Sequence, residues 1–520
     1  MQTADQASTE QDSYRHFLAA LVALGSLLMG LIGNLLFYAH PVGINVFLYV
    51  AVGLLIAFGL LVYLQRPIVY KHAGFALPAA LFALWLGVRL APPLVMFNLT
   101  AMLGSLFVVM HFTGISRFLG GHWLKPVQCL FETAVISWLA SLSAVVPDSL
   151  HWFKRVDLDN QRLATMRSVL RGLLITLPIV AVFTVLLSSA DAVFGDFAEQ
   201  ALSFLLPESA ANVIEQIILT GVFTMVALIG FWTMLYDHAP VFEEIAPHLK
   251  SHRFHLNIIE TSMVLGSVNF LFVAFVMIQA RYFFGGEANI TAQGYTYAEY
   301  ARRGFYELLA VSCMTMLLLV ALENLTYRKR EEENVFRGLV VLMVVLTFVI
   351  LIAAFQRLNL YENAYGYTRI RVMSGTFMVW LAVLLGVLLI AILRHRREVF
   401  WIGCIVTGLP FILTLNLMNM DGFIARHNIA RFENTGGIDV PYLLSLSDDA
   451  IPTVATLIAN PDLDESERDQ LLRGLGNRLY ELDQDRESRD LFGYHLGKAR
   501  AWSALNTYRE SLQPYIYNLR

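Results

Sequence analysis

The chain has 520 residues, of which 57% are hydrophobic and only 15% are charged. Soluble domains are about 45–50% apolar and about 25% charged, so this composition excludes an ordinary soluble protein. The net charge of −4 gives no support to a nucleic-acid partner.

The apolar residues are concentrated in stretches of roughly 20, the length of a helix that crosses a hydrocarbon core about 30 Å thick. An outer-membrane barrel would instead show shorter stretches that alternate between apolar and polar residues. We therefore predict an all-α, polytopic transmembrane bundle, with the lipid bilayer as its main partner.

Eleven stretches are long and apolar enough to span the membrane. They are 17–37, 44–64, 74–91, 94–113, 169–188, 212–236, 257–280, 304–325, 336–356, 374–393 and 399–418. The polar tail 1–16 precedes the first span, which lacks a clear small-residue cleavage site and is predicted to be retained. Pro92 and Pro93 suit a tight turn between the third and fourth spans.

The loops between the spans alternate in charge, and Lys and Arg in short loops mark the cytoplasmic side. The loop after the second span and the segment 114–168 are both basic, so both are predicted to be cytoplasmic. They agree only if the apolar stretch 126–146 does not cross, which favours an interfacial helix. The N-terminus is then inside and the C-terminus outside. The outer loop 357–373 is the main exception, and its arginines are Arg357, Arg369 and Arg371.

The last hundred residues change in character and are predicted to form a small extracytoplasmic domain of about three helices. Leu471, Leu472, Leu475 and Leu479 recur at helical spacing, and the acidic and Ser residues at 462–467 suit a helix start. The predicted organisation is a tail (1–16), four transmembrane helices (17–113), a cytoplasmic segment (114–168), a seven-helix bundle (169–420) and the C-terminal domain (421–520).

Polar residues gather at three places that this orientation brings to the outer face: beyond the fifth span, at the entrance of the eighth, and at the exit of the last. The candidate ligand-binding or domain-docking residues are Asp191, Glu299, Arg302, Arg303, Glu307, Asn419, Asp421, Arg426 and His427. Simple pairing is the alternative, because Glu299, Arg303 and Glu307 are spaced four apart, worth about 0.2–0.5 kcal/mol per pair. Glu307 would also complement the helix dipole in a first turn. Both interpretations stay open.

Little in the sequence indicates catalysis, a metal or a cofactor. Three histidines, His248, His252 and His255, would share one helix face, but their loop is basic and solvated. Phosphate-binding Gly-rich loops, the H-E-x-x-H motif and nucleophile elbows are absent from the sequence. We therefore assign no catalytic residue, no metal ligand and no cofactor.

Charged residues within the spans give little support to transport. Glu260 and Glu323 lie near the cytoplasmic ends of their spans, whereas a charge that indicates an ion pathway would lie at the membrane centre. Pro178 and Pro410 lie within spans and would suit broken helices that bind a substrate. An ordinary proline kink, repaired by neighbouring helices, is the simpler interpretation.

Four stretches together resemble a family of bacterial multi-pass membrane proteins catalogued as a domain of unknown function, numbers 4153 and 4173. They are LRGLLITLPIVAVFTVLLSSADAVF (170–194), YARRGFYELLAV (300–311), MDGFIARHNIAR (420–431) and DVPYLLSLSDDAIP (439–452). The resemblance covers about the last two thirds of the chain and implies a bacterial inner-membrane protein. It brings no activity, ligand or catalytic residue.

Three functions follow as hypotheses. The first is a non-enzymatic membrane protein that binds or senses an extracytoplasmic protein or small-molecule ligand at its outer face. The second is a secondary transporter that moves a small solute through the helix bundle. The third is a membrane-embedded transferase acting on a lipid-linked substrate, which requires carboxylates that converge on a cleft.

Overall fold

The computed structural model describes residues 2–65, 73–110, 208–235, 256, 258–285, 305–327, 329–487 and 491–516. Within these residues the fold is all-helical, with a single isolated β-bridge between Leu256 and Thr326 and no strand. The predicted span 169–188, the predicted interfacial helix 126–146, Pro178 and the three loop histidines lie outside the described residues.

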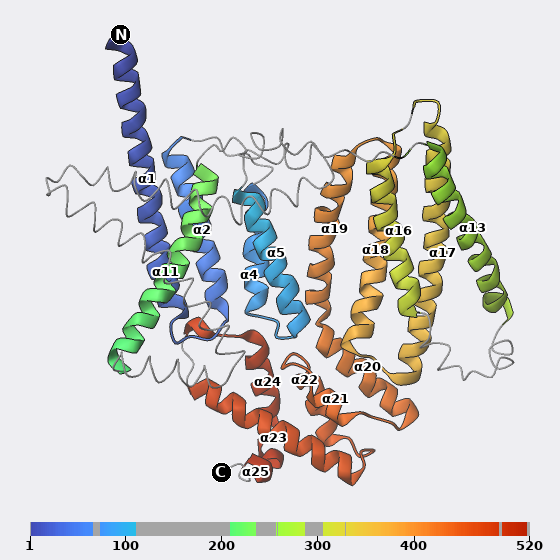
Figure 1. The fold of residues 1–520 in the computed structure, drawn as a ribbon. Helices are drawn as coiled ribbons and strands as arrows, with labels where there is room; N and C mark the ends of the chain where they lie inside the picture. The colour runs from blue at the N-terminus through green and yellow to red at the C-terminus, as the bar shows by residue number, and fades with distance from the viewer. Residues whose placement is uncertain are drawn as a thin grey trace, which may run out of the picture.

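Among the described residues, nine helices are long and apolar enough to cross a membrane (Figure 1). They belong to α1 (Gln2–Phe37), α2 (Ile44–Tyr63), α5 (Pro92–Met110), α11 (Glu208–Leu235), α13 (Ile258–Gly285), α16 (Phe305–Leu325), α17 (Glu333–Tyr365), α18 (Arg369–Leu393) and α19 (Arg397–Met418). Each coincides with one of the predicted spans.

The third predicted span, 74–91, is wrong in its length. Its helix, α4 (Ala76–Leu86), has 11 residues and is about 16 Å long, too short to cross the bilayer alone. Directly after its end, Gly87 lies against the backbone of Gly43 and Ile44, where a Cβ would come within 3.1 Å of the Ile44 nitrogen. The residues that follow leave the helix and contact the C-terminal helices.

The N-terminal helices α1, α2, α4, α5 and α11 form one group, and α13, α16, α17, α18 and α19 form a second (Figure 1). Close packing of α1 on α11 requires Gly33, because a Cβ there would overlap the ring of Phe223. In the second group, Met343 and Val344 of α17 and Leu381 and Leu385 of α18 are fully buried. Contacts between α5 and α19 join the two groups.

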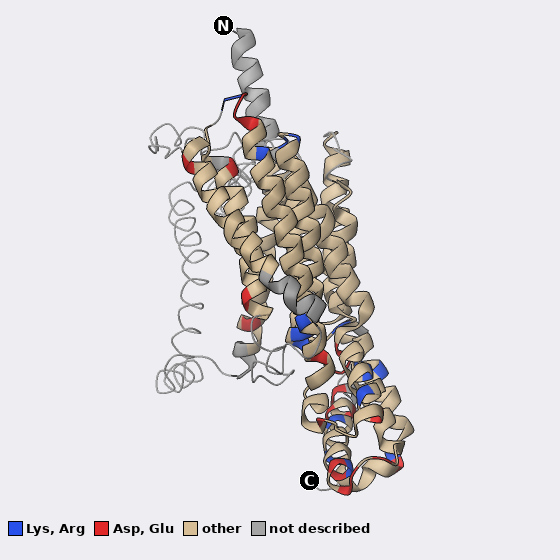
Figure 2. Cartoon of the chain, turned by 90° about the vertical axis from the view of Figure 1, so that its right-hand side faces the viewer, with Lys and Arg blue, Asp and Glu red and all other residues tan. Residues whose placement is uncertain are grey.

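Consecutive described helices run in opposite directions except for α5 and α11, which both run away from the C-terminal helices, so the helix ends lie at two faces of the bundle (Figure 1). Charged residues are concentrated at these two ends and in the C-terminal helices (Figure 2). The end opposite the C-terminal helices carries the basic turns 326–332 and 394–396.

The predicted outer loop 357–373 is almost entirely helical, which corrects its assignment as a loop. Helix α17 continues to Tyr365 and α18 begins at Arg369, so only three residues connect them. Arg371 donates hydrogen bonds to the carbonyls of Tyr365 and Gly366, and its guanidinium lies 3.9 Å from the ring centroid of Tyr361. Arg371, one of the arginines that break the charge pattern, is therefore a helical residue that binds backbone carbonyls and an aromatic ring.

Proline 410 does not break its helix. Helix α19 is continuous through this residue, and the Thr414 hydroxyl donates to the Pro410 carbonyl at 2.9 Å. The proline side chain is exposed on the surface of the described bundle. The structure supports the interpretation of Pro410 as an ordinary proline within a continuous helix. It gives no support to a transporter that uses a broken helix at this position.

The residues after α19 form more helices than the three predicted, and we call residues 420–516 the C-terminal segment. It contains α20 (Met420–Thr435), α21 (Val440–Leu444), α22 (Ile451–Val454), η3 (Ala455–Ala459), α23 (Glu465–Glu487), η4 (Leu491–Gly493), α24 (Leu496–Thr507) and α25 (Arg509–Ile516). The amphipathic pattern is confirmed in α23, where Leu471, Leu475 and Leu479 have no exposed surface.

The C-terminal segment and one end of the bundle share a single apolar core. Leu443, Leu475 and Leu479 of the segment belong to the same buried cluster as Leu94 of α5 and Leu415 of α19. The segment therefore packs on the bundle through buried apolar surface, the main stabilising term in protein association. Polar groups lie at the centre of this contact.

Candidate functional site

The polar centre of the contact, which we call the junction, is built first on an ion pair between Arg369 and Asp421. The guanidinium of Arg369 donates to both carboxylate oxygens, with Nε–Oδ1 at 2.9 Å and Nη2–Oδ2 at 2.5 Å. Asp421 is fully buried and also accepts the Ser447 N–H at 2.8 Å. A buried carboxylate is tolerated only with such partners. The pair fixes the start of α18 against the start of α20.

A second ion pair joins Arg89, in the connection between α4 and α5, to Asp449. The Nη1–Oδ1 distance is 3.5 Å, and both side chains are almost fully buried. Asp449 also accepts the Leu90 N–H at 2.8 Å, while Arg89 Nε donates to the Asn416 carbonyl at 2.9 Å. Burial raises the pKa of Asp449, although the Leu90 N–H and Arg89 act in the opposite direction.

Asparagine side chains complete the frame. Asn98 of α5 and Asn416 of α19 exchange reciprocal amide hydrogen bonds of 3.0 and 2.6 Å, and both residues are fully buried. Asn419 adopts a left-handed conformation (φ 53°) between α19 and α20, as asparagine tolerates better than most residues. Its amide donates to the Asp449 carbonyl at 3.1 Å, and its side-chain oxygen accepts the Gly422 N–H. The turn out of the bundle is thereby tied to the junction.

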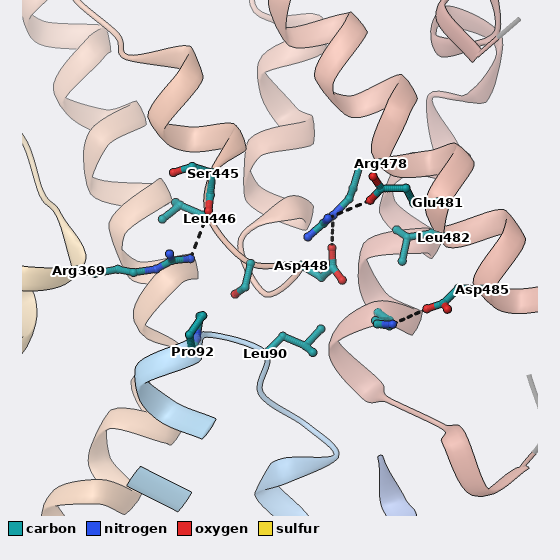
Figure 3. A pocket seen from close by; sticks show the side chains of 12 residues that line it. Leu90, Pro92, Arg369, Ser445, Leu446, Asp448, Arg478, Glu481, Leu482 and Asp485 are labelled. Carbon is teal, nitrogen blue, oxygen red and sulfur yellow. Dashed lines mark hydrogen bonds and ion pairs between the residues drawn. The ribbon is translucent and has the colours of Figure 1, made fainter. Parts of the chain in front are cut away.

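A cavity of about 460 Å³ lies at the junction (Figure 3). Its bundle wall consists of Leu90, Pro92 and Arg369, and its other wall consists of Ser445, Leu446, Ser447, Asp448, Arg478, Glu481, Leu482, Asp485 and Lys498. Pockets of 300–1,000 Å³ are typical of small-molecule sites. The size and the mixed polar lining are those of a site for a small polar molecule.

The charged residues of the cavity wall pair with one another. Arg478 donates to Asp448 (Nε–Oδ1, 2.6 Å) and to Glu481 (Nη1–Oε2, 3.0 Å). Lys498 pairs with Asp485. Figure 3 shows Arg369 reaching into the cavity from the opposite side to Arg478 and Glu481. The lining thus presents donors and acceptors held in position before any ligand arrives.

One lining group lacks a partner. The Ser447 hydroxyl is buried, with 8% of the residue exposed, and makes no hydrogen bond with the residues that the structure describes. Leaving a buried hydroxyl unsatisfied costs about 1–3 kcal/mol. A ligand oxygen or nitrogen in the cavity would satisfy it.

The site residues predicted from the sequence lie in different places. Asn419 and Asp421 are at the junction. Arg426 is exposed on α20, and its charge acts on Arg89, lowering the pKa of that group in addition to the larger effect of burial. His427 packs against Phe423 and Tyr367, with its Nδ1 2.9 Å from the Phe423 carbonyl, which is a structural role.

The cluster at the eighth span is only partly described. Glu307 is exposed in the first turn of α16, as the helix-dipole interpretation predicts, and α16 packs on α17 and α18. Asp191, Glu299, Arg302 and Arg303 lie outside the described residues. The proposed gathering of all three clusters therefore stays a prediction.

Sequence reasoning missed most of the residues that line or hold the cavity, including Arg89, Asp449 and Arg478. A signal existed for Arg369, because it belonged to the loop that violated the charge pattern. Asp448 and Asp449 lie in one of the family-like stretches, but nothing in that stretch showed their partners. Within the described residues, no three His, Cys, Asp or Glu side chains are grouped so as to hold a metal.

No curated protein and no solved structure matches this chain. One family model matches residues 76–457, from the first residue of α4 into η3. The match begins earlier than the sequence resemblance suggested and includes both buried ion pairs, whereas α23 and α24 lie beyond it. Its description is "Domain of unknown function (DUF4153)", and since the match covers well over half of the sequence, the chain belongs to this family.

Proposed function

We propose that this is a non-enzymatic protein of the bacterial inner membrane that binds or senses a small ligand at its extracytoplasmic face. The basic loops support an orientation with the N-terminus inside and the C-terminal segment outside. The single observation that carries the proposal is the cavity at the junction, because its walls come from both the bundle and the C-terminal segment.

Sensing follows from this shared wall. A ligand that touches both walls binds better when the segment is docked than when it is displaced. Such a ligand shifts the population toward the docked state by the difference between the two affinities. A partner protein could then recognise the docked or the displaced arrangement of the C-terminal segment.

The test is hydrogen exchange of the purified full-length protein, with and without a desalted small-molecule extract of bacterial periplasm. We expect slower exchange at residues 445–449 and 478–485, which line the cavity, and no change in α13 and α16. No change at the junction would contradict the proposal. Slower exchange confined to the interior of the bundle would favour transport instead.

The transferase is the second candidate, because three carboxylates, Asp448, Glu481 and Asp485, converge on the cavity. Each is paired with a cation, Asp448 and Glu481 with Arg478 and Asp485 with Lys498, which holds it in position at the cavity. A transferase would lose turnover of a lipid-linked substrate on Asp448→Asn while still binding it. A protein that only binds its ligand would show no turnover with or without this substitution.

A further inference from the structure

We infer that the ligand of the junction cavity is a small zwitterion, with a carboxylate and an ammonium group of the kind that free amino acids carry. This inference rests on the proposed function and names the chemistry of its ligand. It is argued from the charges of the two walls, the unpartnered Ser447 hydroxyl and the size of the cavity.

One end of the cavity offers hydrogen-bond donors. Arg369 reaches the cavity, whereas its partner Asp421 is fully buried and is not part of the lining (Figure 3). Within the described residues, Nη1 of Arg369 makes no hydrogen bond, so its N–H groups remain available. The Ser447 hydroxyl belongs to the same end, because the Ser447 N–H donates to Asp421. A carboxylate is the group that a guanidinium and a hydroxyl recognise best.

The opposite wall carries an excess of negative charge. It contains three carboxylates, Asp448, Glu481 and Asp485, against two cations, Arg478 and Lys498, which is a net charge of −1. Asp448 and Glu481 each use one oxygen for Arg478 and keep the second oxygen as an acceptor. An ammonium group would find its acceptors here.

The whole lining is neutral, with three cations and three carboxylates. Because Arg369 is already paired with Asp421, it offers a ligand carboxylate hydrogen-bond donors rather than an uncompensated charge. A zwitterion supplies a hydrogen-bonding group to each end of the cavity. The volume of about 460 Å³ accommodates a molecule of amino-acid size.

The experiment is isothermal titration of the purified full-length protein with L-serine and L-glutamine as probes. N-acetyl-L-glutamine (no ammonium), L-glutamine methyl ester (no carboxylate) and glucose (a neutral polyol) are the matched controls. We expect at least one zwitterion to bind, and both blocked glutamine derivatives to bind at least about tenfold more weakly than glutamine, the effect of losing a charge-assisted hydrogen bond. Binding of glucose alone, equal binding of a blocked derivative, or no binding of either zwitterion would overturn the inference.

Variants locate the site. Ser447→Ala and Glu481→Gln should each weaken zwitterion binding by about fivefold or more without lowering the melting temperature. Asp469→Asn is the control, because Asp469 lies on the same helix as Glu481, pairs with Arg473 and does not line the cavity. Binding that is unaffected by Ser447→Ala and Glu481→Gln would contradict the assignment. If the periplasmic extract protects residues 445–449 but both zwitterions fail, this inference is wrong and the proposed function stands.

Discussion

At the scale of single residues, the two buried ion pairs of the junction differ in how well each carboxylate is satisfied. Asp421 accepts two hydrogen bonds from Arg369 and one from the Ser447 N–H. Asp449 accepts one good hydrogen bond, from the Leu90 N–H, and a longer contact from Arg89. The Arg369–Asp421 pair is thus the tighter of the two connections.

Arg369→Gln should destabilise docking of the C-terminal segment strongly. It removes the cation from a fully buried carboxylate, which costs about 3–5 kcal/mol. The measurement is denaturant unfolding of the purified protein in detergent, followed by protease cleavage of the segment. Arg473→Gln, which breaks an exposed pair within α23, is the control and should leave stability unchanged. Equal effects of the two substitutions would show that the buried pair is not important.

The pH dependence of docking should reflect Asp449. Burial raises its folded-state pKa above the ordinary value of 3.8, so its stabilising contribution is greatest below that value and is lost as pH rises through the raised pKa. Asp449→Asn mimics the protonated form. We therefore expect the melting temperature of the variant, relative to the natural protein, to increase as the pH is raised from 4 to 7. A difference that decreases over this range would contradict the assignment.

At the scale of elements, hydropathy and periodicity predicted which stretches are helices but not where they end. Helix α17 continues through 357–365, although these residues are too polar for a span, because hydropathy reports membrane residence and not helicity. Helix α4 stops at Leu86, and the Gly87 that follows meets the Gly43–Ile44 backbone, a tertiary contact that no local pattern contains. Helix α23 was predictable because its leucines face a core at regular helical spacing.

Leu479→Ala tests that shared core. Leu479 has no exposed surface, and its truncation should cost about 2–5 kcal/mol through lost burial and the cavity left behind. Asn477→Ala, at an exposed position two residues earlier on α23, is the matched control and should have little effect. The measurement is the unfolding free energy of the full-length protein in detergent. Similar values for the two variants would mean that α23 does not pack as described.

At the scale of the whole molecule, a polar junction closes one end of an up-and-down helix bundle. Asn419 and Asp421 were predictable because they follow the last span, at the predicted outer face. Arg89 and Asp449 were not, since 360 residues separate them and a single sequence does not show which distant residues pair. The family match adds that both buried pairs lie within the region shared by the family.

Ligand binding at an extracytoplasmic face requires that the C-terminal segment lies outside the cytoplasm. Single cysteines at Gln484 and Glu331 test it, since both positions are exposed and they lie at opposite ends of the molecule. The three native cysteines, Cys129, Cys313 and Cys404, would first be replaced by serine. A membrane-impermeant maleimide applied to intact spheroplasts should label Gln484→Cys at once and Glu331→Cys only after lysis. Labelling of Glu331→Cys alone in intact spheroplasts would reverse the orientation and contradict the account.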